Sequence, residues 1–224
     1  MRKPGLLAAM SVCTLALTLI TSGAAQATMT YDANVTNGVY FGTGNINGAW
    51  TIANASGYEL ALRAKVYQGL PITPEVGTGI YDTKAGTYGS GTHPNRPLWN
   101  WEFSIDNLNL NGTLSGLTAL ITITDVNTNL STAAFDLLSI PDNAHLGSQG
   151  VQNSESLVFF APPGFNPSAG DSYRFAVSLN QTTGNIPIVA NSITVNAVPE
   201  PATMALFGVG VFGLAAARRR RGKA

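Results

Sequence analysis

The sequence predicts an all-β fold: an antiparallel, jelly-roll-like β-sandwich, with a cleavable N-terminal signal helix before it and a single C-terminal transmembrane helix after it. Three observations support this prediction. Several segments alternate apolar and polar residues with a period of two, which is typical of a strand buried on one face. The composition is rich in Gly, Asn, Thr and Ser, which suits short strands joined by turns. An uncharged apolar run lies near each end of the chain.

The first domain, residues 1–27, is predicted to be a signal peptide for Sec-type export machinery. A positively charged start is followed by an apolar stretch at 6–20. Ala25 and Ala27 form an A-x-A cleavage site, so we expect the mature chain to begin at Thr28.

Removing both terminal segments changes the charge of the protein. Between Thr28 and Val198 the chain has five basic and eleven acidic residues, a net charge of −6, whereas the whole chain sums to zero. Such a mildly acidic domain with scattered charges argues against nucleic acid as a partner. The only cysteine, Cys13, lies in the segment predicted to be removed, so cysteine catalysis is not expected.

The body, residues 28–197, is predicted to be one exported β-sandwich domain. Its strongest strand patterns lie at 58–66, 99–106 and 172–179, each with one apolar and one polar face. We expect the polar faces to be solvated. They include Glu59, Arg63, Lys65, Glu102 and Asp106.

Weaker strand patterns complete the expected sandwich. They lie at 39–43, 49–53, 117–126, 157–160 and 192–197. Asn-Gly, Ser-Gly and Ala-Gly pairs between the segments supply turns. About eight short strands with no strong helix are typical of a sandwich.

The third domain, residues 198–224, contains three ordered elements. They are a motif of Val198, Pro199, Glu200 and Pro201, an apolar helix at 202–217, and a basic tail at 218–224 that opens with Arg218, Arg219, Arg220 and Arg221. As a helix the apolar run is about 24 Å long, just short of a bilayer core of about 30 Å. The prolines set its N-terminal edge, and the arginines are expected to stay on the cytoplasmic side.

These three elements resemble the PEP-CTERM sorting signal of Gram-negative bacteria, which is also labelled the ice-binding protein C-terminal domain. The resemblance implies that an exosortase processes the signal. It also implies an inner-membrane anchor with the body in the periplasm, followed by release to the cell surface or extracellular matrix. The body resembles a group of PEP-CTERM proteins in its Glu59–Lys65 and Trp99–Ser104 segments, a likeness that carries no established activity.

We expect the protein to be non-enzymatic, with a structural or adhesive role in exopolysaccharide or biofilm. The alternative is a carbohydrate-binding module, for which exopolysaccharide is the candidate partner and Trp50 the candidate sugar contact. Trp99 and Trp101 share a face with core residues and are expected to pack inside.

A polysaccharide-acting hydrolase is the less favoured alternative. Glu102 and Asp106 lie on one strand about 13 Å apart, whereas paired glycosidase carboxyl groups lie roughly 5 to 9.5 Å apart. One strand alone therefore does not supply the pair, and we predict no catalytic residue, cofactor or metal ligand.

Overall fold

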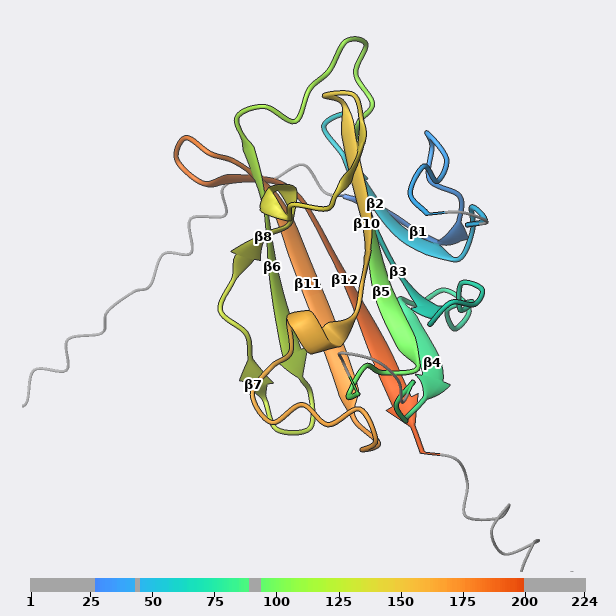
Figure 1. Cartoon of the computed structure of the whole chain (residues 1–224). Coiled ribbons are helices and arrows are strands. Elements are labelled where there is room, and N and C mark those ends of the chain that lie inside the picture. Colours follow the sequence, from blue (N-terminus) through green and yellow to red (C-terminus); the bar gives the residue numbers. More distant parts are fainter. Residues whose placement is uncertain (1–26, 43–44, 89–93, 200–224) are drawn as a thin grey trace, which may run out of the picture.

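Alternating apolar and polar residues build two facing β-sheets in the computed structural model, which describes residues 27–42, 45–88 and 94–199 (Figure 1). The apolar faces of the two sheets pack against each other and form the core. The predicted all-β, two-layer fold is confirmed.

Sheet A has six strands, and every neighbouring pair in it is antiparallel. In spatial order they are β1 (Thr28–Ala33), β2 (Trp50–Ala55), β3 (Tyr58–Val66), β5 (Trp99–Asn107), β10 (Gly150–Glu155) and β9 (Ala144–Leu146).

Sheet B faces it and also has six strands. In spatial order they are β4 (Ile80–Lys84), β12 (Ile186–Val198), β11 (Ser172–Gln181), β6 (Leu117–Asp125) and β7 (Leu130–Ser131), with β8 (Phe135–Asp136) also paired with β6. The pair β4 and β12 is parallel, which corrects the expectation of a wholly antiparallel sandwich. The finer likeness to a jelly roll stays a prediction.

Aromatic side chains from both sheets meet at the centre of the core. Trp101 of β5 lies 5.4 Å from Phe175 of β11, measured between ring centroids. Trp99 contacts the same phenylalanine edge-on at 6.2 Å. Both tryptophans are buried, as their alternation with polar neighbours predicted.

Two of the weaker strand predictions are wrong. Residues 157–160 begin as a 3-10 helix, η2 (Leu157–Phe159), because a short apolar run carries no periodicity that separates strand from helix. The described part of 39–43 is not a strand, and Gly42 there has a φ of 68°, which interrupts an extended backbone. A second 3-10 helix, η1, spans Leu137–Ser139.

The two targeting segments lie almost wholly outside the described residues. Of the predicted signal peptide only Ala27 is described. It packs against the core one residue before β1, whereas Ala25 lies outside. The predicted helix at 202–217 also lies outside. Within the ranges that the structure covers, no helix is long and apolar enough to cross a membrane.

Candidate functional site

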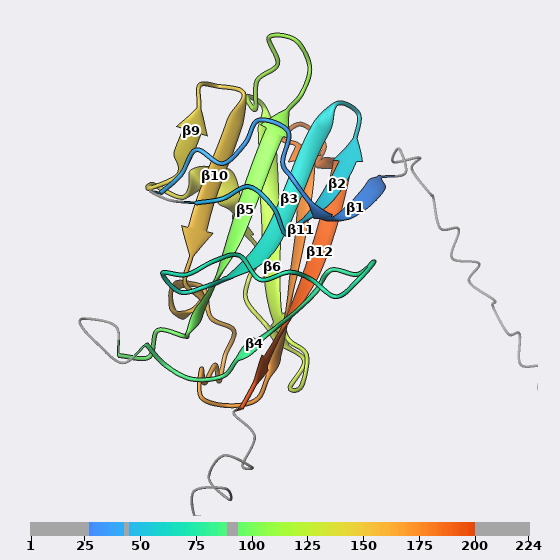
Figure 2. The same cartoon turned by 90° about the vertical axis from the view of Figure 1, so that its right-hand side faces the viewer.

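The outward face of sheet A is covered and not solvated, which corrects the prediction for its polar residues. Between β1 and β2 the described residues 34–42 and 45–49 cross in front of β5 and β10, and we call them together the covering segment 34–49 (Figure 2). Beneath it Glu59, Arg63, Glu102 and Asp106 are at most 2% exposed. The alternation placed these side chains on the correct face, but that face is a second, polar interior.

Arg63 holds the covering segment to the sheet. Its Nε donates to Glu102 Oε2 at 2.5 Å, and its Nη1 donates to the carbonyl oxygens of Ile46 and Gly48 at 2.9 and 2.7 Å. Its guanidinium lies 4.1 Å from the ring centroid of Trp50. Burial lowers the pKa of Arg63, and the adjacent Glu102 carboxylate opposes this shift.

Trp50 is therefore not the surface platform that the sequence suggested. Its side chain is 0% exposed and belongs to a small apolar cluster with Val35, Phe41, Ile52 and Ala61. Sugar recognition needs a ring face open to solvent. The candidate sugar contact is thus corrected to a structural residue, and the sequence missed this because the covering segment carries little apolar signal.

A buried glutamine also fastens the covering segment to sheet A. The Oε1 of Gln152 accepts a hydrogen bond from the Tyr40 backbone N–H at 3.0 Å. Its Nε2 donates to the carbonyl oxygen of Gly38 at 2.8 Å and to Ser104 Oγ at 3.0 Å. The polar groups of this glutamine are satisfied only when the segment lies over the sheet.

Two carboxylates meet beneath the same segment. Glu59 of β3 and Asp106 of β5 are direct cross-strand neighbours. Glu59 accepts hydrogen bonds from the backbone N–H and the hydroxyl of Thr36, the latter at 2.7 Å. Burial first, and then the negative charge of Glu59, raise the pKa of Asp106 to about 6. Carboxylates from two strands do converge here, but they are enclosed by the fold.

A further acidic side chain lies near the far edge of sheet A. Glu155 of β10 accepts a hydrogen bond from Asn153 Nδ2 at 2.9 Å, and the same amide group contacts Asp142 at 3.2 Å. Burial, followed by the charge of Asp142, raises the pKa of Glu155 to about 7. Among the residues that the structure describes, no group of three or more His, Cys, Asp or Glu side chains could hold a metal ion.

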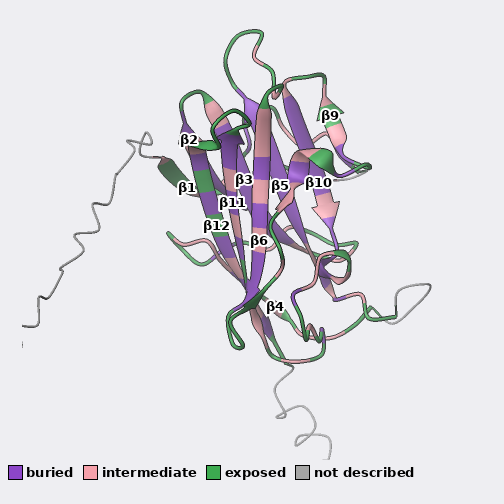
Figure 3. Cartoon of the chain, turned by 90° about the vertical axis from the view of Figure 1, so that its left-hand side faces the viewer, coloured by how far each residue is buried: buried purple, intermediate pink, exposed green. Residues whose placement is uncertain are grey.

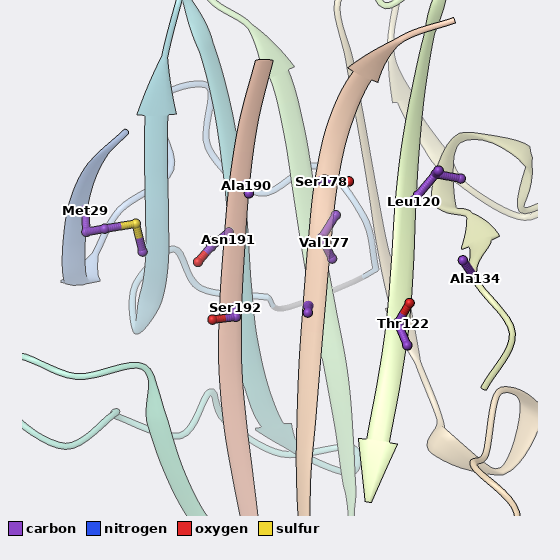
Figure 4. Close-up of a pocket in the computed structure, with 10 residues that line it drawn as sticks. Met29, Leu120, Thr122, Ala134, Val177, Ser178, Ala190, Asn191 and Ser192 are labelled. Atoms are coloured by element: carbon purple, nitrogen blue, oxygen red, sulfur yellow. The ribbon is translucent and has the colours of Figure 1, made fainter. Parts of the chain in front are cut away.

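The outer face of sheet B carries a broad, shallow trough of about 710 Å³. Bands of buried and more exposed residues alternate along its strands in Figure 3. Figure 4 shows mostly small side chains across the trough, among them Ser192, Ser178 and Thr122, with Met29 at one border and Ala134 at the other. In the described part of the chain, no charged side chain lines the trough.

The sorting motif begins inside the last strand of the sandwich. Val198 pairs with Lys84 of β4, and its carbonyl oxygen accepts a hydrogen bond from the Ala85 N–H at 2.9 Å. A side chain at Gly170 would come within 2.5 Å of the Pro199 ring, so this glycine makes room for the proline. The remaining predicted motif and anchor residues lie outside the described ones. They are Glu200, Pro201, Arg218, Arg219, Arg220 and Arg221.

A groove of about 770 Å³ lies beside this exit from the fold, and we call it the exit groove. It runs between the end of β3 and strand β4, the edge strand of sheet B. Its lining is largely apolar and includes Val66, Tyr67, Ile72, Tyr88, Leu98 and Val198. Sequence reasoning missed it because its residues are scattered over four segments with no shared motif.

Aromatic contacts fix one wall of the exit groove. The rings of Tyr67 and Tyr88 lie 4.4 Å apart between centroids, at an angle of 60°. Tyr88 donates its hydroxyl hydrogen to Gln68 Oε1 at 2.9 Å, and Arg96 Nη1 donates to the Tyr67 hydroxyl at 2.6 Å. These contacts restrain both tyrosines against the sandwich.

Comparison with known protein families finds a sorting signal that begins where the chain leaves the sandwich. Residues 197–221 match the family described as the PEP-CTERM protein-sorting motif. No curated protein and no solved structure matches the chain. The chain therefore carries a PEP-CTERM sorting motif, the signal of an exported protein that an exosortase processes for sorting to the cell surface.

Proposed function

We propose that the β-sandwich is the cargo of this signal and serves, after processing, as a structural or adhesive component of the cell surface or extracellular matrix. In this proposal the predicted helix at 202–217 anchors the chain in the inner membrane until an exosortase processes it, and the body has no catalytic role. The signal itself is found at residues 197–221.

The observation that carries the proposal is the continuity of β12 with the sorting motif. Val198 belongs to both, so no linker separates the folded body from the signal. A body built in this way is delivered as a rigid unit directly at the processing site. The buried polar layer under the covering segment adds contacts that stabilise the fold, which suits a structural role.

The alternative of a carbohydrate-binding module loses Trp50, its named candidate sugar contact. Trp50 is enclosed beneath Arg63, so the ring face that a sugar needs is occupied. We therefore do not retain it as a second proposal.

The test is export of the full chain in a host with and without its exosortase, followed by mass spectrometry of the released protein. We expect released protein to lack 202–217 only when the exosortase is present. Glu200→Gln within the motif should reduce processing, whereas Glu75→Gln at an exposed loop position should not. Released protein that still contains 202–217 in the exosortase-positive host would refute processing by the exosortase.

The matrix role needs a separate measurement. Deleting the gene should lower the cohesion of biofilm or flocs, and the wild-type gene should restore it. Unchanged cohesion after deletion, with sorting intact, would refute the structural role while leaving the sorting assignment in place.

A further inference from the structure

We propose that the exit groove and its rim form a membrane-contacting surface, which rests on the phospholipid bilayer while the sorting signal is intact. The proposal rests on the membrane anchoring proposed above, and it adds that the folded body itself touches lipid. The ligand class is a phospholipid surface.

Exposed apolar side chains gather around the exit. Val66, Leu70, Tyr88, Phe159 and Val198 are between 42% and 64% exposed. Three of them line the exit groove, and Leu70 lies in the tight turn that follows β3, where its carbonyl oxygen accepts from the Val66 N–H at 3.0 Å. An exposed apolar patch of this kind on a soluble domain marks a contact surface.

The Arg96 side chain connects Phe159 to the same surface, because its guanidinium contacts the rings of both Tyr67 and Phe159. The guanidinium carbon of Arg96 lies 5.2 Å from the Tyr67 ring centroid and 5.5 Å from the Phe159 ring centroid. Aromatic rings beside a basic side chain are the composition found at the headgroup level of membranes, where apolar groups enter the interface and cations meet phosphate.

The length of chain between the sandwich and the apolar run limits how far this surface can lie from the bilayer. Only residues 199–201 separate Val198 from the run at 202–217. Three residues span at most about 11 Å even when fully extended. Because Val198 itself lines the exit groove, an inserted anchor holds the groove next to the headgroups.

Local charge at the exit is compatible with an anionic bilayer although the body is acidic as a whole. Lys84 and Asp82 both line the groove, and Arg96 lies beside it against the Tyr67 ring. The Asp82 carboxylate accepts a hydrogen bond from Asn196 at 2.9 Å. Two basic side chains and one acidic side chain therefore meet the membrane with the apolar groups, so the local balance is basic although the body as a whole is acidic.

The absence of cysteine from the body makes a direct test straightforward. In a full chain with Cys13→Ser, single cysteines at Leu70→Cys or Ile186→Cys carry an environment-sensitive fluorophore. Ile186 is a matched control because it is aliphatic and 53% exposed, against 64% for Leu70. It begins β12, at the opposite end from Val198, about 40 Å away along the strand.

The labelled proteins are bound to vesicles of phosphatidylethanolamine and phosphatidylglycerol, and fluorescence is quenched either by nitroxide-bearing lipid or by an aqueous quencher. We expect the Leu70 label to shift its emission to shorter wavelength and to be quenched mainly by the lipid nitroxide. The Ile186 label should keep aqueous emission and be quenched mainly from water. Adding Tyr88→Ser and Val66→Ser should return the Leu70 label toward aqueous behaviour.

Co-flotation of the protein with the vesicles tests membrane anchoring separately from lipid contact by the folded body. If the protein floats but the Leu70 and Ile186 labels behave alike, the anchor holds and the lipid contact is refuted, which leaves the exit groove to a water-soluble ligand such as a glycan. If the protein does not float, both the anchor and the contact are refuted.

Discussion

Replacing Arg63 should open the polar interior of sheet A. In the wild-type protein its guanidinium pairs with Glu102 at 2.5 Å, with both side chains fully buried. It also donates to two backbone carbonyls of the covering segment 34–49. Arg63→Met removes the cation, keeps much of the side-chain volume and leaves the Glu102 carboxylate buried beside a more distant lysine.

The expected loss of stability follows from that unpaired charge. Breaking a buried ion pair from one side costs about 3–5 kcal/mol, because the remaining charge keeps its desolvation penalty. For a domain of this size, each kcal/mol lowers the melting temperature by roughly 2–4 °C. Arg63→Met should therefore lower it by roughly 6–20 °C.

Urea denaturation followed by circular dichroism measures the free energy of unfolding, and limited proteolysis reports whether segment 34–49 has become accessible. Lys65→Met is the matched control, since Lys65 lies 3.6 Å from Glu102 and is partly exposed. It should cost less than Arg63→Met, because Arg63 still pairs with Glu102 when Lys65 is replaced. The double variant Arg63→Met with Glu102→Leu should recover most of the loss, because no buried charge remains.

Two results would refute this reasoning. One is a loss below about 1 kcal/mol for Arg63→Met, which is the range of an exposed pair. The other is a double variant that is no more stable than Arg63→Met alone, which would show that packing and not charge dominates the site.

Three further predictions concern other buried groups of sheet A. Gly150→Ala should cost about 1–3 kcal/mol, because the added Cβ collides with the Asp106 carboxylate, and Asp106→Ala should reduce that cost in a double-mutant cycle. The raised pKa values of Asp106, about 6, and Glu155, about 7, mean that their contribution to stability is full below about pH 4 and lost as pH rises through 6 to 7. Asp106→Asn with Glu155→Gln should flatten this decline in urea titrations across pH, and an unchanged slope would contradict it. Trp50→Ala should cost about 3–5 kcal/mol in urea titrations, and a stability close to wild type would show that the ring is not a core residue.

Sequence periodicity was sufficient to predict a strand where one face of the strand is apolar and the other polar. The pattern at 58–66 matches β3 in full, and that at 117–126 matches β6 to within one residue. Trp99 and Trp101 pack inside as predicted, because their alternation with polar residues leaves only one face for the core.

Periodicity failed where burial depends on a partner that is distant in sequence. β10 contains one apolar residue, Val151, and reads as a loop, yet Gln152 is fully buried. Its burial comes from a segment more than 100 residues earlier, through the bond from Gln152 to Gly38. Only the cross-strand register of β3 and β5 shows that Arg63 faces Glu102, and register is not written in either strand alone.

The candidate site also has one part that the sequence predicted and one part that it did not. The sorting motif is contiguous, so its identity could be read directly from the sequence, whereas the exit groove is assembled from separated segments and could not. The two meet at Val198, whose backbone completes the β4–β12 pairing and whose side chain lines the groove. Because the same residue closes the sandwich and opens the signal, cleavage before Pro199 would place a new carboxylate at the last hydrogen bond of β12. A carboxylate accepts the Ala85 N–H as the carbonyl does, so the β4–β12 pairing does not depend on which side of Pro199 is cleaved.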